Sequence, residues 1–219
     1  MGYYNPFLNY GEQKLMIDCK AAGVDGFIIV DLPPEEAVRF RNLATEHGLS
    51  YIPLITPTTT EERIKRLVTI ASSFIYVVSV SGVTGARDAV SSQLPELVEK
   101  IKKYTSIPLA VGFGVSTREH FTNVAAHSEG VVIGSKIITV LKNSPAGKRG
   151  QAVKEFAQEI TQSTKRDVEV DDGVKEITSS VKAVDLGKSS HLMEPRFGEF
   201  GGQYAPEALV DCLEEIEKV

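Results

Sequence analysis

The sequence of 219 residues contains no tryptophan, two cysteines, three methionines and no long apolar run. Cys19 and Cys212 lie near opposite ends of the chain without a CxxC spacing, which predicts two reduced thiols rather than a disulfide framework. No apolar run approaches the roughly 20 residues that span a bilayer, so we expect no association with a membrane. The opening MGYYNPFLNYGE lacks the basic and apolar regions of a secretory signal. These absences favour a cytoplasmic protein.

Neither a metal nor a nucleic acid is expected as a ligand. The four histidines show no metal-ligand spacing with Cys, Asp or Glu. The formal net charge is -5, and acidic and basic residues are interspersed. Nucleic-acid backbones are held by basic stripes, so this pattern argues against such a partner. It does not exclude one small phosphate ester, because a few backbone N–H groups bind a phosphate without any local excess of positive charge.

Short apolar runs alternate with amphipathic segments from about Asn9 to Thr164. These runs are almost continuously apolar, as in strands that are buried on both faces of a parallel sheet. They are GFIIVDL (26–32), SYIPLIT (50–56), FIYVVSV (74–80), IPLAVGFG (107–114) and GVVIGS (130–135). Repeated strand–helix units predict an α/β fold with a parallel sheet. The pattern alone does not separate a (β/α)8 barrel from a doubly wound sheet.

Helices are predicted between the apolar runs by the spacing of apolar residues and by start signals. The stripes are Ile64, Leu67, Val68, Ala71; Leu94, Leu97, Val98, Ile101; and Val153, Phe156, Ala157, Ile160. Thr59 with Glu62 predicts a capping box at the start of one helix, and Ser116 with Glu119 predicts another.

The chain divides into three expected parts. Residues 1–164 hold too few strand–helix units for a closed eight-fold barrel, and MGYY is long enough only for the tail of a strand, so we expect strands to be missing at the front. Residues 165–190 are polar and lack a sustained period, which indicates a linker. For residues 191–219 the sequence predicts a glycine-rich turn and an amphipathic helix. A single helix cannot bury its own apolar face, so we interpret this segment as the truncated start of a second domain.

The last two apolar runs each end in a glycine turn. These turns are GFG (112–114) and GS (134–135). Glycine lets the backbone approach an oxyanion, and a helix N-terminus adds oriented N–H groups with a partial positive charge. Ser135 also offers its hydroxyl. Phosphate in (β/α)8 enzymes binds at the loops after strands 7 and 8, and these turns take that place if three strands precede. The sequence therefore predicts a phosphate site here.

Three further features leave alternatives open. The turn SGVTGA (81–86) is either a lid over a ligand or a plain connection. Asp31 ends a strand and is either a general acid or base or, as we favour, a hydrogen-bond partner for the start of the following helix. Tyr76 lies within a strand, and its residue type alone favours core packing. No convincing pair of catalytic carboxylates is present.

The ordered motifs GVDGFIIVDLPPEEA (23–37), SGVTGA, GFGVS and GVVIGS resemble the α subunit of tryptophan synthase. The resemblance implies a (β/α)8 TIM barrel, present here from the end of strand 3 through strand 8 and the last helix, that splits indole-3-glycerol phosphate into indole and glyceraldehyde 3-phosphate. PRFGEFGGQYAPEAL (195–209) is similar to the start of the β subunit, the pyridoxal-phosphate enzyme that joins indole to serine. This tandem resembles the single-chain fusion of fungi and implies a lyase of tryptophan biosynthesis.

The resemblance implies substrate contacts at Tyr76, Thr84 and Gly85, and phosphate contacts at Phe113, Gly114, Gly134 and Ser135. It makes Tyr76 a ligand wall and SGVTGA a lid that excludes water. It places both catalytic carboxylates before residue 1 and the Schiff-base lysine beyond Val219. We therefore expect no catalytic residue and no bound cofactor in this chain, pyridoxal phosphate in the full-length β domain, and no activity of the chain alone.

The implied partners are the phosphate ester and the remaining α and β domains of the same enzyme, with a homodimer formed through the β domain. The loop Tyr3–Leu8 is expected to face the second domain. One rival is another phosphate-binding barrel, an isomerase or epimerase, but such a barrel has no reason to carry PRFGEFGGQYAPE. A second rival is a non-catalytic assembly module, against which stand the unpaired edges of an open parallel sheet.

Overall fold

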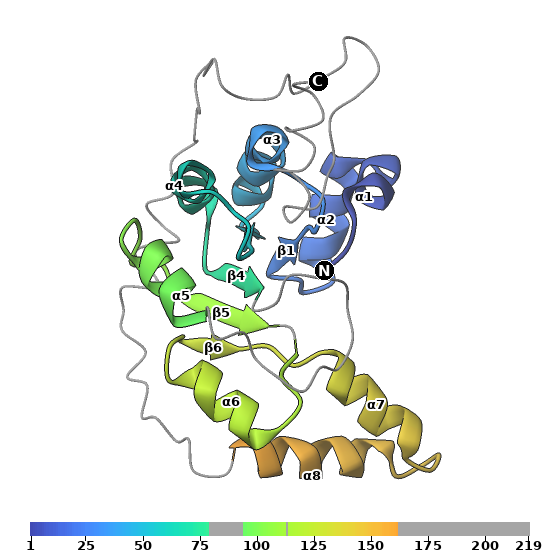
Figure 1. The fold of residues 1–219 in the computed structure, drawn as a ribbon. Coiled ribbons are helices and arrows are strands. Elements are labelled where there is room, and N and C mark those ends of the chain that lie inside the picture. Colours follow the sequence, from blue (N-terminus) through green and yellow to red (C-terminus); the bar gives the residue numbers. More distant parts are fainter. Residues whose placement is uncertain (79–93, 113, 162–219) are drawn as a thin grey trace, which may run out of the picture.

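The computed structural model describes residues 1–78, 94–112 and 114–161 (Figure 1). Helices and strands alternate along most of this part, which confirms the expected α/β class. The elements are α1 Tyr4–Tyr10, α2 Glu12–Ala21, β1 Gly26–Ile28, α3 Pro34–Glu46, β2 Ser50–Ile52, β3 Leu54–Ile55, α4 Glu61–Ile70, β4 Ile75–Val78, α5 Leu94–Lys102, β5 Leu109–Gly112, α6 Arg118–Ala125, β6 Gly130–Val131, α7 Ser135–Asn143 and α8 Arg149–Thr161.

Each of the strand pairs in the described residues is parallel, in the orders β1-β2 and β3-β4-β5-β6. The single strand expected over residues 50–56 is two short strands, because Pro53 has no N–H to donate to a sheet. The carbonyl of Pro53 still accepts the N–H of Tyr76 at 3.0 Å. One segment of chain therefore pairs with β1 through its first half and with β4 through its second.

The N-terminal residues lie beside the end of β1 and correct one expectation. Gly2 forms an isolated parallel bridge with Ile29. The expected loop Tyr3–Leu8 is instead mostly the helix α1. Its first N–H, on Tyr4, donates to Asp31 Oδ1 at 2.7 Å, and the Tyr4 ring packs edge-on against Phe40 with the centroids 5.9 Å apart. This contact with a residue distant in sequence stabilises the helix start.

Both predicted capping boxes are wrong by one residue. Thr60, not Thr59, caps α4, and its hydroxyl accepts an N–H three residues later. Thr117, not Ser116, caps α6 in the same way. Neighbouring hydroxyl residues offer the same capping chemistry, so tertiary packing decides which of them stands at the cap position. Thr59 instead accepts the N–H of Thr56 at 3.0 Å within the loop before α4.

Apolar side chains are buried on both faces of the sheet, as the continuous apolar runs predict, because successive residues of a strand point to opposite faces. One face joins the main core beneath the helices, with members such as Ile55, Ile75, Val77, Leu109 and Val111. The opposite face carries a smaller cluster of Ile52, Leu54, Tyr76 and Val78, against which Ile28, Phe74 and Val132 pack. We call this second set the inner cluster.

Burial is uneven along the chain. Among the described residues, α7 buries none of its side chains, although its sequence SKIITVLKN is amphipathic, and Ile138 is 64% exposed. It lies beside α8, far from α1 and α2 (Figure 1). None of the helices in the described ranges is long and apolar enough to cross a membrane.

Candidate functional site

The predicted phosphate-binding turns begin side by side at one edge of the sheet. Strands β5 and β6 are paired with Ala110 opposite Gly130, and Val132 N–H continues the ladder to the carbonyl of Val111 at 2.8 Å. The segments that follow β5 and β6 then leave the sheet in the same direction, since the strands are parallel. The arrangement brings Gly114 and Gly134 to the carboxyl end of the sheet, where β/α barrels bind their ligands.

The turn after β5 depends on a glycine. Gly114 has φ +82, in the left-handed region that side chains with a Cβ rarely adopt. The chain passes through this residue into Thr117, which caps α6. The neighbouring Phe113, a predicted phosphate contact, lies outside the described residues.

The turn after β6 opens the N-terminus of α7. Gly134 occupies the N-cap position, and within the described part of the chain no side chain caps this helix. A Cβ at Gly134 would meet nothing within 4 Å, so the space beside it is open. Ser135 is exposed and begins the helix. The first N–H groups of an uncapped helix are unsatisfied by the helix itself, so this turn has the chemistry of an anion site.

Tyr76 lies in the inner cluster at the centre of this arrangement. It is 4% exposed and stands opposite Ala110 in the register of β4 and β5. Burial raises the pKa of its hydroxyl, which stays neutral at physiological pH. A Cβ at Gly112 would overlap that hydroxyl oxygen and lie 2.7 Å from Cζ. Glycine at position 112 therefore provides the space that the phenol ring occupies.

The role of Gly112 was missed by sequence reasoning, which treated it as one residue of a glycine turn. The contact joins two strands that are distant in sequence, so no local pattern signals it. The prediction for Asp31 also needs correction. Its carboxylate accepts an N–H at the start of α1, which precedes it in the chain, and not at the start of α3 as predicted. Its structural role is supported, but the helix is a different one.

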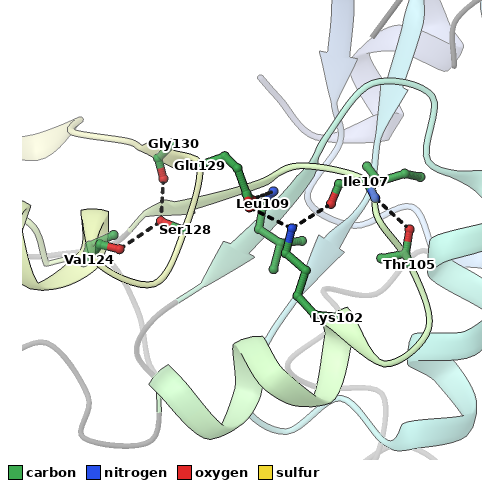
Figure 2. A network of polar contacts seen from close by, with 8 residues as sticks. All are labelled: Lys102, Thr105, Ile107, Leu109, Val124, Ser128, Glu129 and Gly130. Carbon is green, nitrogen blue, oxygen red and sulfur yellow. Dashed lines mark hydrogen bonds and ion pairs between the residues drawn. The ribbon is translucent and has the colours of Figure 1, made fainter. Parts of the chain in front are cut away.

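The opposite end of the same strands carries a network of side chains (Figure 2). One Glu129 oxygen accepts the N–H of Leu109 at 2.8 Å, and the other accepts Lys102 Nζ at 2.9 Å. Burial disfavours ionisation of Glu129, but the hydrogen bonds from Leu109 and Lys102 outweigh it and lower its pKa. Ser128 Oγ contacts the carbonyls of Val124 and Gly130, both at 3.0 Å.

Other predicted site features fall outside the described residues. These are Thr84, Gly85 and the rest of SGVTGA, as well as the linker and the second domain start from residue 165 onward. In the ranges that are described, no group of three or more His, Cys, Asp or Glu side chains could hold a metal ion. The described part of the candidate site consists of backbone N–H groups, the hydroxyl of Ser135 and the buried ring of Tyr76.

Comparison with known proteins identifies a family. Residues 1–168 match the family model for the tryptophan synthase alpha chain. The tryptophan synthase of Saccharomyces cerevisiae is 50% identical over 227 residues, which cover 100% of this chain and 32% of that protein. The tryptophan synthase alpha chain of Roseiflexus castenholzii is 46% identical over 158 residues, covering 72% of this chain and 60% of that one.

Solved structures agree with these sequence relatives. A mutant tryptophan synthase alpha-subunit from Pyrococcus furiosus superposes with a TM-score of 0.65 at 32% identity, covering 73% of this chain and 64% of that one. A structure of the tryptophan synthase α2β2 complex from the same organism gives 0.65 at 34% identity with the same coverage.

The chain spans about a third of the yeast protein and about three fifths of the Roseiflexus α chain. Its parallel strands and helices correspond to part of the TIM barrel of the α subunits, which confirms the predicted fold class. An isomerase or epimerase barrel is not favoured by these matches. The boundaries proposed at residues 164 and 190 stay predictions. By sequence and by fold, the chain belongs to the tryptophan synthase α-chain family.

Proposed function

We propose that the described residues form the phosphate-binding part of the α site of a tryptophan synthase. Its substrate would be indole-3-glycerol phosphate, which a retro-aldol reaction splits into indole and glyceraldehyde 3-phosphate. The observation that carries the proposal is the pair of turns at one edge of the sheet, with Gly114 after β5 and the uncapped start of α7 after β6. The family supplies the reaction class, that of a lyase.

Each residue has a role that follows from its chemistry. The N–H groups at the start of α7 and the hydroxyl of Ser135 would donate to phosphate oxygens. Gly114 would bring its backbone close to the same group. The buried, neutral Tyr76 would form an apolar wall for the indole ring without placing a negative charge near the phosphate. We assign Phe113 to the phosphate turn, and Thr84 and Gly85 to the lid.

Proton transfer would need carboxylates from another part of the enzyme. Asp31 already accepts the first N–H of α1, which supports a structural role for it. We therefore propose that this chain binds the substrate but does not release indole by itself. The α part needs no cofactor. In the β part, pyridoxal phosphate would supply the electron sink for joining indole to serine, and we assign no described residue to it.

Exposed apolar side chains near the N-terminus support a partner there. Tyr3, just before α1, and Leu8 and Tyr10 of α1 are 60%, 37% and 48% exposed. Exposed apolar side chains that gather on a surface mark interaction sites. We propose that this segment contacts the β domain of the same enzyme, with a cytoplasmic homodimer formed through that domain.

Ser135→Asp in the full-length fused enzyme tests the proposal. A carboxylate at the start of α7 would repel the substrate phosphate, so we expect the KM for indole-3-glycerol phosphate to rise about tenfold or more. Thr139→Asp adds the same charge one turn along the helix and serves as the control. Synthesis of tryptophan from added indole and serine should stay unchanged in both variants. An unchanged KM in Ser135→Asp would show that the substrate phosphate does not bind at this turn.

A further inference from the structure

A buried ion pair joins the first turns of α3 and α4. Arg63 Nη1 lies 3.2 Å from Glu35 Oε1, and the two side chains are 7% and 9% exposed. Glu35 is favourably placed at a helix N-terminus, where the dipole attracts negative charge. Arg63 has the opposite charge at the same place in α4, where the dipole opposes it. The helix alone does not explain a buried arginine there, whereas the contact with Glu35 does.

The loops that lead into these two helices are also fixed by long-range and local hydrogen bonds. The hydroxyl of Tyr51 in β2 donates to the carbonyl of Leu32 at 3.1 Å, in the loop before α3. The loop before α4 is closed by the N–H of Thr56, which donates to the buried Thr59 hydroxyl. Both loops follow strands, so the ion pair lies at the same end of the sheet as the phosphate-binding turns.

The loop before α4 leads directly from the strand that supports Tyr76. Leu54 of β3 stands opposite Tyr76 in the register of β3 and β4, and both belong to the inner cluster. A shift of the first turn of α4 would therefore be transmitted through Thr56 to the end of β3 and to the ring of Tyr76. The ion pair between Arg63 and Glu35 holds the first turn of α4 at a defined distance from α3.

We propose that Glu35 and Arg63 are positioning residues for the α site. Their ion pair holds the turn after β3, and through it the Tyr76 wall, in the position that receives the indole part of the substrate. The proposal rests on the proposed function, since it assigns Tyr76 to the substrate wall. It goes beyond that function by naming two side chains that act on the site through the loops and not by contact with the substrate.

Stability and positioning are separable for such a pair. Removing one partner leaves an uncompensated buried charge and is strongly destabilising, whereas replacing both by apolar side chains of similar size is often neutral or stabilising. A variant without either charge can thus keep the fold while losing the fixed distance between α3 and α4. That difference defines the experiment.

The experiment compares variants of the full-length fused enzyme, assayed below the melting midpoint of each. In the double variant Glu35→Met with Arg63→Met we expect a near-unchanged melting midpoint and a KM for indole-3-glycerol phosphate raised about tenfold, with a smaller change in kcat. The single variant Arg63→Lys keeps the positive charge beside Glu35. Its KM should lie between that of the unaltered enzyme and that of the double methionine variant. The exposed pair Lys65 and Glu61 on α4, 3.3 Å apart, is the control for KM, and Lys65→Met with Glu61→Met should leave KM unchanged. Its melting midpoint should fall slightly, because Glu61 also accepts the hydroxyl of Tyr104.

The outcomes separate the two proposals. An unchanged KM in the double methionine variant would show that the ion pair serves stability alone. If the double variant folds poorly, Glu35→Gln decides, because it removes the negative charge of the pair at nearly the same side-chain size, and an unchanged KM in that variant also overturns the positioning role. Absence of indole release from the unaltered enzyme would instead refute the proposed function. Tryptophan synthesis from added indole and serine monitors folding of the rest of the enzyme.

Discussion

At their amino ends β5 and β6 are joined by the charged side chain of Glu129, whereas at their carboxyl ends they leave the sheet through glycines. Glu129 binds both Lys102 and the backbone of Leu109 at the first end (Figure 2). Gly114 and Gly134 mark the second end, where an uncapped helix begins. The comparison teaches that one pair of strands is stabilised by side chains at one end and carries at the other the two turns that we propose for phosphate binding, the division expected of β/α barrels.

The largest expected effect comes from filling the space at the carboxyl end. Gly112→Val places atoms where the Tyr76 hydroxyl lies, so we expect a loss of stability of about 2 kcal/mol and a large rise in KM for the substrate. Gly150→Val in α8, where a Cβ meets nothing within 4 Å, is the matched control and should be near neutral. Denaturant unfolding and KM measurement in the full-length enzyme check both.

A double-mutant cycle sharpens that result. Tyr76→Ala removes the ring that occupies the space, so adding it to Gly112→Val should cost less than the sum of the two single changes. Additive stability losses would mean that valine at position 112 disturbs the sheet in another way. The contact between ring and glycine would then not be the reason for the glycine.

A smaller effect is expected from breaking the amino end. Glu129→Gln weakens the hydrogen bonds to Leu109 and Lys102, so we expect a loss of about 1 kcal/mol of stability with no change in KM for the substrate. The folded state lowers the pKa of Glu129 below its ordinary value of 4.5. Its stabilising contribution is therefore full above pH 4.5 and is lost as the pH falls through the lowered pKa.

The variant and the unaltered enzyme should accordingly converge in stability at acidic pH. Unfolding curves at a series of pH values measure this. A difference that persists at low pH would show that the ionised carboxylate is not what joins the strands. A raised KM in Glu129→Gln would contradict the division of roles between the two ends.

The smallest effect on folding is expected at α7, beyond the open end of β6. Ile138 is 64% exposed, so Ile138→Lys should change stability by less than about 0.5 kcal/mol.

The isolated chain should self-associate through its exposed apolar surfaces, and the lysine at position 138 should reduce this association. Sedimentation velocity of the two isolated chains measures it. A monodisperse monomer of the unaltered chain would contradict the prediction.

Much of the architecture was predictable because it depends on local pattern. Apolar runs placed strands, since their burial on both faces leaves no polar alternation. The stripe around Ile64 and Leu67 placed α4, and all of Ile64, Leu67 and Val68 are buried. Glycines after β5 and β6 placed the two turns. Gly114 has a φ of +82, which favours glycine, whereas a Cβ at Gly134 would meet nothing within 4 Å.

Other features were out of reach of the sequence because their partners lie far away in the chain. Which of several hydroxyl residues caps α4 or α6 depends on packing, so both capping predictions were one residue off. The helix α1 replaced an expected loop because Asp31 accepts its first N–H. The contact between Arg63 and Glu35 joins two separate helices and leaves no local signal.

The sequence by itself determined the strand–helix order, the parallel sheet and the position of the two glycine turns, since each follows from the residues at that point of the chain. Only the tertiary structure decided that Tyr76 rests against Gly112, that β2 and β3 separate at Pro53, and that α3 and α4 are joined by buried charges. The physical reason is the same in each case: these features depend on atoms that meet only after the chain has folded.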